Sequence, residues 1–311
     1  MASLPRFQGI PDILYGTAFK FEQSASLVSE ALKAGFRAID TAGSRTAYQE
    51  DLVGNAIDSA ITSGHVKRHE LYIQTKFSPF KAGKDPALYP YDTAKSISEQ
   101  VEESVASSLA NLRTTYIDCL VLHSLYQDIQ NTLIAWKAME ALVPSKVASL
   151  GVSNCDLESL RQLWEAADIK PVVVQNRFTE DIAGRPNPAM PPNLPYPLVS
   201  FDRDVREYCG THGIVYAPWG LLWGNPSVLD DPKQILETAG QEIGVSKQIL
   251  LYAIMRSIGG CEMSILCGTT KVAKMHETLE GLTKIKSYIA ESDIQRKRWE
   301  DYARSIRDII C

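Results

Sequence analysis

The chain has 311 residues, of which 45% are hydrophobic and 22% are charged, as in ordinary globular proteins. Its 32 basic and 37 acidic side chains give a formal net charge of −5. Surfaces that bind nucleic acid or anionic membranes are basic, so neither partner is expected. No apolar run approaches the roughly 20 residues that span a bilayer. The six cysteines include no Cys-x-x-Cys pair and the first residues lack the layout of a signal peptide, which predicts a cytoplasmic protein with reduced thiols.

Short apolar runs alternate with helical patterns along the whole chain. The runs are apolar at nearly every position, as expected for parallel strands buried on both faces. The predicted strands are 13–17, 36–40, 71–76, 117–123, 149–153, 172–175, 214–218 and 263–267. The predicted helices are 24–34, 50–62, 93–112, 132–142, 157–167, 202–211, 247–257, 272–285 and 292–310.

This alternation predicts the α/β class and a (β/α)₈ TIM barrel that forms a single domain, 1–311. The alternative is a doubly wound open sheet, which would carry a Gly-rich phosphate turn after its first strand. The chain has neither Gly-x-Gly-x-x-Gly nor a P-loop. A proline-rich stretch, 182–199, has no helical or strand period and follows the sixth predicted strand. In a barrel it would lie on the active-site face, either as a lid or binding loop or as a surface insertion without a role in the site.

Polar residues end several predicted strands, and in a barrel these ends line the active-site mouth. Asp40, Lys76 and His123 end the second, third and fourth strands, and Tyr48 lies just beyond Asp40. Packing does not explain this pattern, because unpaired charges are rarely buried.

These residue types together favour carbonyl chemistry. An Asp holds a Lys charged, and the ammonium stabilises a nearby phenolate and so lowers the pKa of the tyrosine. Such a phenol can donate a proton to a developing alkoxide, and a neutral His can orient the carbonyl. None of these groups is a hydride source, so a reduction needs a cofactor.

With these residues, the chain resembles the aldo-keto reductases, NAD(P)H-dependent carbonyl reductases built on a (β/α)₈ barrel. The segments that carry the resemblance follow one another in the family's order. They are Gly-Phe-Arg-Ala-Ile-Asp-Thr-Ala (35–42), Tyr48 with Glu50 and Val53-Gly54, Thr75-Lys76, Leu122-His123, Gly-Val-Ser-Asn (151–154), Gln175-Asn176 and Gly-Thr-Thr (268–270).

The resemblance implies a catalytic tetrad of Asp40, Tyr48, Lys76 and His123, with Tyr48 as the proton donor. It implies that Ser153, Asn154 and Gln175 hold the nicotinamide carboxamide and that Tyr216 stacks on the ring. The remaining cofactor-binding residues that it implies are Thr17, Asp40, Ala217, Trp219, Gly268, Thr269, Thr270, Lys274, Glu277 and Thr278.

The spacing before Tyr48 departs from the family pattern. Tyr48 lies eight residues after Asp40, whereas the family usually places its tyrosine about five residues after the aspartate, so the insert 43–47 must loop out. A subset that resembles fungal members shares this spacing. Tyr15, Tyr72 and Tyr216 are the alternative donors, and Arg45 in the insert is either a contact for an acidic substrate or a solvated side chain.

The residues expected at the adenosine end of the cofactor site also depart from the family pattern. Gly268 replaces the first basic residue of the family's usual Lys-Ser, and Lys274 falls where an Arg grips the 2′-phosphate. We expect NADPH, with Lys271 or Lys274 as the cation and NADH as the open alternative. Trp219 and Trp223 lie where the family usually has a loop over the pyrophosphate. They are either a platform for the substrate or packing residues.

These features predict a monomeric enzyme that reduces a small-molecule aldehyde or ketone, bulky and apolar, to an alcohol. The first alternative is a cofactor-binding regulatory or scaffold barrel with little or no catalysis. The second is a hydrolase with Asp40 and Glu50 as paired carboxylates. No spacing typical of metal ligands joins the five histidines to other ligand types, so no metal is expected.

Overall fold

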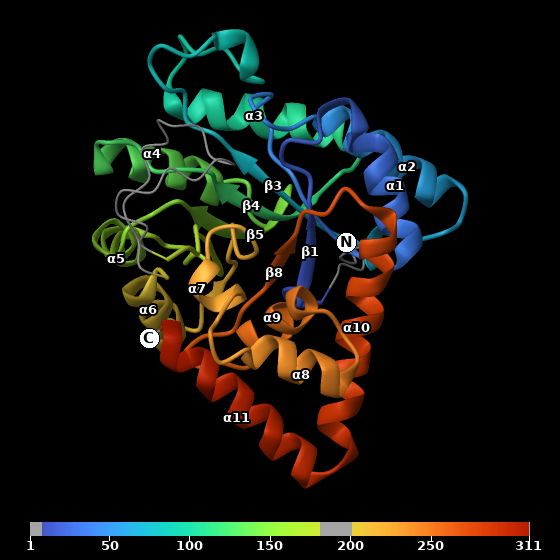
Figure 1. Cartoon of the computed structure of the whole chain (residues 1–311). Coiled ribbons are helices and arrows are strands. Elements are labelled where there is room, and N and C mark those ends of the chain that lie inside the picture. Colours follow the sequence, from blue (N-terminus) through green and yellow to red (C-terminus); the bar gives the residue numbers. More distant parts are fainter. Residues whose placement is uncertain (1–7, 181–200, 311) are drawn as a thin grey trace. The chain divides into compact units, whose positions relative to one another are not determined.

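The computed structural model describes residues 8–180 and 201–310, so the proline-rich stretch 182–199 lies outside the described residues (Figure 1). Eight strands alternate with helices in chain order. The strands are β1 (Ile13–Gly16), β2 (Ala38–Asp40), β3 (Tyr72–Phe77), β4 (Ile117–Leu122), β5 (Val147–Ser153), β6 (Val173–Gln175), β7 (Val215–Tyr216) and β8 (Ile265–Cys267). All eight predicted strands are confirmed, most of them shorter than the apolar runs that predicted them.

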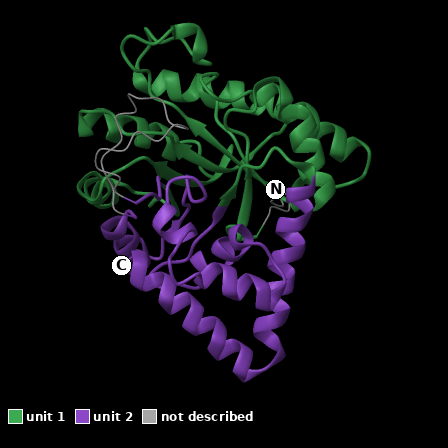
Figure 2. Cartoon of the chain, in the orientation of Figure 1, with its two compact units in different colours: residues 1–175, 266–272 green, residues 176–265, 273–311 purple. Residues whose placement is uncertain are grey.

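The helices are α1 (Ser24–Ala34), α2 (Glu50–Thr62), α3 (Ile97–Asn111), α4 (Ile129–Glu140), α5 (Leu157–Ala166), α6 (Arg203–His212), α7 (Pro226–Leu229), α8 (Ile235–Ile243), α9 (Lys247–Met255), α10 (Val272–Glu291) and α11 (Asp293–Ile310). The chain forms two compact units, residues 1–175 with 266–272 and residues 176–265 with 273–311, here called unit 1 and unit 2 (Figure 2). The single-domain assignment stays a prediction.

Unit 1 is built on a parallel sheet with the strand order β6-β5-β4-β3-β2-β1-β8. Its register pairs Gly16 with Asp40, Asp40 with Gln74, and Ser153 with Gln175. The strands β2, β3 and β4 are buried at every position, as expected for parallel strands that are covered on both faces. The helices α1 to α5 pack against one another in chain order beside the sheet.

Local capping decides where the helices of unit 1 begin and end. Helix α1 ends at Ala34, as predicted, and is followed by Gly35, whose φ of 113° is left-handed. Helix α3 begins at Ile97, later than predicted, because Ser96 and Glu99 form a capping box. Helix α4 begins earlier than predicted because Asp128 accepts a hydrogen bond from the Gln130 amide.

Unit 2 contains two helices that the sequence analysis did not predict, α7 and α8. In α8 the buried residues recur at helical spacing (Leu236, Ala239, Gly240 and Ile243), but its N-cap, Gln234, makes no capping hydrogen bond. A helix without a capping residue has no start signal in its sequence. Helix α11 packs against α7, α8 and α9, and α10 extends beyond its predicted end to Glu291.

Candidate active site

A buried Asp–Lys ion pair forms the centre of the candidate site in unit 1. Asp40 ends β2 and Lys76 lies in the neighbouring strand β3. The Lys76 Nζ lies 2.7 and 2.8 Å from the two carboxylate oxygens of Asp40 and 2.8 Å from the Thr41 carbonyl oxygen. Burial lowers the pKa of Lys76, and the charge of Asp40 opposes that effect. Because a buried charge must be paired, this contact explains why opposite charges occupy neighbouring strands.

Tyr48 lies next to this ion pair, at the end of the loop between β2 and α2. Its ring centroid is 5.0 Å from the Lys76 Nζ and 5.7 Å from the centroid of the His123 ring, which it meets edge-on at 68°. The insert 43–47 is tied back at its end, where the Ala47 carbonyl accepts a hydrogen bond from the Phe19 amide at 2.7 Å. The lengthened spacing therefore still leaves Tyr48 beside Lys76 and His123.

His123 directly follows β4 and is held by neighbouring loops. Its Nδ1 lies 2.6 Å from the Ser78 Oγ, and its carbonyl oxygen accepts a hydrogen bond from the Asn154 side chain at 2.8 Å. Burial, followed by the positive charges of Lys76 and Lys81, lowers the pKa of His123 well below its usual value. The imidazole is therefore neutral near pH 7.

The residues predicted to hold a carboxamide come together at the carboxyl ends of β5 and β6. Ser153 Oγ donates to the Gln175 carbonyl at 2.5 Å, and the Gln175 amide donates to Asp40 at 3.2 Å. The Asn154 Oδ1 is buried and accepts no hydrogen bond from any described residue. An acceptor left open at this place fits the N–H of a nicotinamide carboxamide. Thr17 is also buried here, with its Oγ1 donating to the Asp40 carbonyl at 2.9 Å.

Lys20 is a residue of this region that the sequence analysis missed. It lies in the loop after β1, and its Nζ donates to the Gly268 carbonyl at 2.9 Å. The Tyr15 hydroxyl donates to the carbonyl of the next residue, Thr269, also at 2.9 Å. Lys20 is buried. Its position just after the first strand was the only signal in the sequence that could have identified it. Thr270, which follows Thr269, is exposed.

In unit 2, Tyr216 ends β7 and is fully buried. Its hydroxyl donates to the Asp202 carboxylate at 2.9 Å, and the Asn176 amide donates to the same oxygen at 2.8 Å. Burial raises the pKa of Asp202 to about 6. Ala217, which follows Tyr216, is buried. The ring centroids of Trp219 and Trp223 lie 6.2 Å apart.

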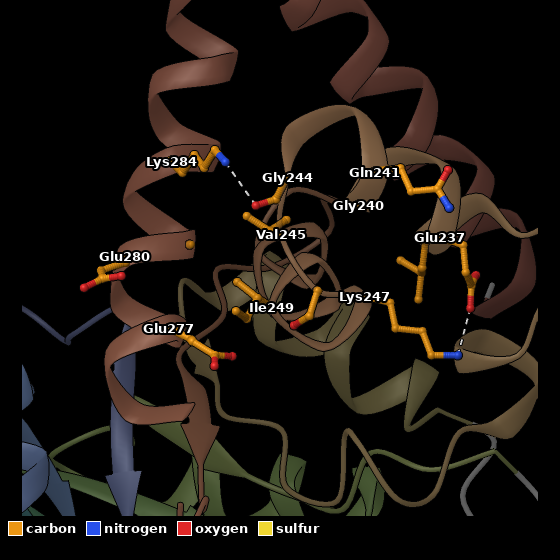
Figure 3. Close-up of a pocket in the computed structure, with 13 residues that line it drawn as sticks. Glu237, Gly240, Gln241, Gly244, Val245, Lys247, Ile249, Glu277, Glu280 and Lys284 are labelled. Carbon is orange, nitrogen blue, oxygen red and sulfur yellow. Dashed lines mark hydrogen bonds and ion pairs between the residues drawn. The ribbon is translucent and has the colours of Figure 1, made fainter. Parts of the chain in front are cut away.

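The predicted adenosine-binding residues lie in the first turns of α10. Lys274 and Glu277 are exposed and form an ion pair at 2.5 Å, and the Thr278 hydroxyl donates to the Lys274 carbonyl at 2.6 Å. Glu277 also borders an open cavity of about 650 Å³ between α8, α9 and α10, where most of the charged side chains are already paired (Figure 3). The Lys247 Nζ contacts Glu237 there, and the Lys284 Nζ contacts the Gly244 carbonyl.

Glu50, the second carboxylate of the hydrolase alternative, is buried in a site of its own. It accepts hydrogen bonds from the Thr75 and Ser108 hydroxyls. Burial raises its pKa to about 7. Both carboxylates are thus engaged by protein groups, Asp40 by Lys76 and Glu50 by hydroxyls. This arrangement does not favour two carboxyl groups acting on one bond.

Neither a metal site nor a membrane-spanning helix is found in the part of the chain that the structure describes, residues 8–180 and 201–310. No three His, Cys, Asp or Glu side chains gather there as a metal site would require. No helix in these ranges is long and apolar enough to cross a membrane.

The chain is similar to known reductases along most of its length. The family model of the Aldo/keto reductase family matches residues 12–284. The methylglyoxal reductase DkgA of Salmonella typhimurium is 28% identical over 74% of this chain and 70% of its own. The D-galacturonate reductase of Fragaria ananassa is 29% identical over 72% of this chain and 66% of its own.

Solved structures show the same fold. The crystal structure of an aldo/keto reductase from Brucella melitensis has a TM-score of 0.67 at 21% identity and covers 94% of this chain and 95% of its own. An aldo-keto reductase complexed with NADPH has a TM-score of 0.67 at 18% identity, over 94% of this chain and 84% of its own. The strand–helix repeat and these likenesses make the fold a (β/α)₈ barrel. The chain belongs to the aldo/keto reductase family and is an NAD(P)H-dependent oxidoreductase.

Proposed function

We propose that this enzyme reduces a bulky, apolar aldehyde or ketone to an alcohol with NADPH, and that Tyr48 donates the proton. The observation that carries the proposal is the position of the Lys76 Nζ, 5.0 Å from the Tyr48 ring centroid, with His123 on the same ring. Relatives named for the reduction of methylglyoxal, D-galacturonate and D-xylose are consistent with a carbonyl substrate.

Each member of the tetrad has a separate task in this proposal. Asp40 holds Lys76 charged and in place through two hydrogen bonds. The ammonium favours the phenolate that Tyr48 becomes after it gives up its proton. With the Ser78 hydroxyl donating to Nδ1 of the neutral His123, the ring proton stays on Nε2, which donates to the carbonyl oxygen of the substrate.

The alternative tyrosines are poor proton donors. Burial raises the phenol pKa of Tyr15, Tyr72 and Tyr216 above the usual value. The Tyr15 and Tyr216 hydroxyls already donate to protein oxygens, those of Thr269 and Asp202. A proton on such a group is harder to transfer near neutral pH. Tyr48 is therefore the donor that the contacts favour.

The cofactor is assigned to residues that fit its groups. When bound, NADPH supplies the hydride that a carbonyl reduction needs. The open Oδ1 of Asn154, beside Ser153 and Gln175, accepts from the carboxamide. Lys274, an exposed cation in the first turns of α10, binds the 2′-phosphate as a point charge.

Replacement of Tyr48 by Phe tests the proposal. We expect kcat to fall by about a hundredfold or more, because the general acid is lost, while NADPH binding is unchanged. Tyr288→Phe is the matched control, because the hydroxyl of that tyrosine donates to Glu242 in unit 2, and this variant should keep full activity. The measurements are NADPH oxidation with aromatic ketones and quenching of tryptophan fluorescence. Turnover that survives in Tyr48→Phe contradicts the role of Tyr48. NADPH binding without reduction of any carbonyl by the wild type favours the scaffold alternative.

A further inference from the structure

The insert 43–47, which directly precedes Tyr48, is tied to the rest of unit 1 at every second residue. Its backbone hydrogen bonds join Gly43 to Lys76 at 3.2 Å, Arg45 to Leu88 at 2.8 Å and Ala47 to Phe19 at 2.7 Å. The partners lie in β3, in the loop between β3 and α3, and in the loop between β1 and α1. Extra residues in a loop add conformational freedom, which these ties remove from the insert.

Two hydroxyl groups hold the insert in shape between these ties. The Ser44 Oγ and the Thr46 Oγ1 lie 2.8 Å apart, and the Ser44 Oγ also accepts a hydrogen bond from the Thr46 amide at 3.4 Å. Ser44 is buried, whereas Thr46 is exposed. A serine hydroxyl that binds the backbone two residues ahead favours one local turn over the other conformations of a loop. The pair therefore keeps the turn closed just before Tyr48.

The chain is also anchored beyond Tyr48, where α2 begins. The Glu50 carboxylate accepts hydrogen bonds from the hydroxyls of Thr75 on β3 and Ser108 on α3. Ser108 also lies beside the insert, because an added Cβ at Gly43 would come within 3.4 Å of its Oγ. Tyr48 is therefore held between two anchored ends, both of which rest on β3 and α3.

In the proposed mechanism, the distance between Tyr48 and Lys76 decides how readily the phenol gives up its proton. The charged and titratable groups around the Tyr48 ring include the Lys76 ammonium, 5.0 Å from the ring centroid and paired with Asp40, and the His123 ring, whose centroid lies at 5.7 Å. Charge interactions in a protein weaken as the distance grows. A Tyr48 ring that moved away from the ammonium would therefore be a weaker acid and a poorer proton donor.

We propose that the insert 43–47 is a strap that positions Tyr48 for proton donation, and that Ser44 and Thr46 are positioning residues of this strap. The inference rests on the proposed function and adds residues that act through Tyr48 rather than on the substrate. The ties explain how the lengthened spacing still leaves a tyrosine beside the buried ion pair. Each hydroxyl contributes by keeping the phenol at its present distance from the ammonium.

Variants of Thr46 test the strap without a change of charge. Thr46→Val removes the hydroxyl and keeps the shape of the side chain, whereas Thr46→Ser keeps the hydroxyl. Thr283→Val is the matched control, because Thr283 is an exposed threonine of α10 whose hydroxyl is also hydrogen-bonded. The measurement is kcat for the reduction of benzaldehyde with NADPH from about pH 6 to about pH 10, with NADPH affinity followed by tryptophan fluorescence.

In Thr46→Val we expect kcat to fall about fivefold, the loss of one neutral hydrogen bond, with NADPH affinity unchanged. The basic limb of the pH profile, where the donor loses its proton, should move up by about half a pH unit, as for a phenol about 1 Å farther from the ammonium. Thr46→Ser and Thr283→Val should match the wild type. Ser44→Ala should reproduce the shift, and its combination with Thr46→Val should add nothing, because both changes remove the same hydrogen bond.

The basic limb separates positioning from stability, because a smaller folded fraction lowers activity without moving the limb. An unmoved limb in Thr46→Val, or the same loss of kcat in Thr46→Ser, would overturn the strap and leave the proposed reductase intact. Residual activity of Tyr48→Phe that keeps the wild-type limb would instead show that Tyr48 is not the donor, and the strap would fail with that role.

Discussion

In the proposed mechanism, Lys76 serves both stability and chemistry. Its three ammonium hydrogens are used by Asp40 and the Thr41 carbonyl, so its position over Tyr48 is determined by protein contacts alone. Such preorganisation means that the charge does not have to move during the reaction. It also means that the ammonium cannot be removed without leaving the buried Asp40 unpaired.

Lys76→Met should therefore affect stability and turnover together. We expect the free energy of unfolding to fall by about 3–5 kcal/mol, because one partner of a buried pair is lost. Turnover should fall by about a hundredfold through the weaker general acid. The double variant with Asp40→Asn should recover stability but not turnover. Urea denaturation and NADPH oxidation measure the two effects, and recovery of both would show that Lys76 acts on folding alone.

Glu50 predicts a pH dependence of stability. Burial raises its pKa from the usual 4.5 to about 7, so between these values the folded state holds a proton that the unfolded state has released. The free energy of unfolding should therefore fall as pH rises through this window, by up to about 3 kcal/mol. Glu50→Gln should remove this dependence and be the more stable form at pH 8. Urea titrations between pH 5 and 8 measure the pH dependence of the free energy of unfolding. The control is Glu102→Gln, at an exposed position. Parallel curves for wild type and Glu50→Gln would contradict the prediction.

At the scale of elements, Gly54 explains part of the motif that revealed the family. It lies in α2, where an added Cβ would come within 1.9 Å of the Asn111 carbonyl oxygen at the end of α3. Only glycine permits this approach of the helix to the backbone of its neighbour.

Gly54→Ala should destabilise the protein although alanine favours helices. The two backbones must separate, which should cost about 1–3 kcal/mol, as overpacking does. Ser59→Ala, at an exposed position of the same helix, should stay within about 0.5 kcal/mol of wild type. Thermal unfolding followed by circular dichroism compares the two variants. A stable Gly54→Ala would mean that α2 and α3 are free to move apart.

At the scale of the whole molecule, the proposed binding of the 2′-phosphate by Lys274 makes nucleotide selectivity depend on α10. Lys274→Ala should weaken NADPH binding by about tenfold, because a charged contact to phosphate is lost, and should leave NADH binding unchanged. Lys297→Ala on α11 controls for the loss of a surface charge. Tryptophan fluorescence titration measures the affinities of wild type and of both variants for NADPH and NADH. An equal loss of affinity for both nucleotides would show that Lys274 does not bind the 2′-phosphate. Lys20 or Lys271 would then be the residue to replace.

The predicted monomer is tested at the same scale. We expect a single species of 34.4 kDa by size-exclusion chromatography with light scattering. A particle of twice that mass, unchanged on dilution, would contradict it.

The βα repeat and the order of the reactive residues can be predicted from the amino-acid sequence. Strand periods and caps are local, since the strands consist largely of apolar residues and Gly35 ends α1 wherever that helix lies. Asp40, Lys76 and His123 were identifiable because parallel strands bring their carboxyl ends to one edge.

Contacts between residues that are far apart in the chain were known only once the chain's fold was known. The Tyr48 insert could not be positioned from its length, because its closure depends on the Phe19–Ala47 hydrogen bond from another loop. Lys20 was indistinguishable from a solvated lysine until the Gly268 carbonyl was found beside it. The physical reason is that hydrogen bonds and charge interactions depend on distance in space, which local sequence patterns do not encode.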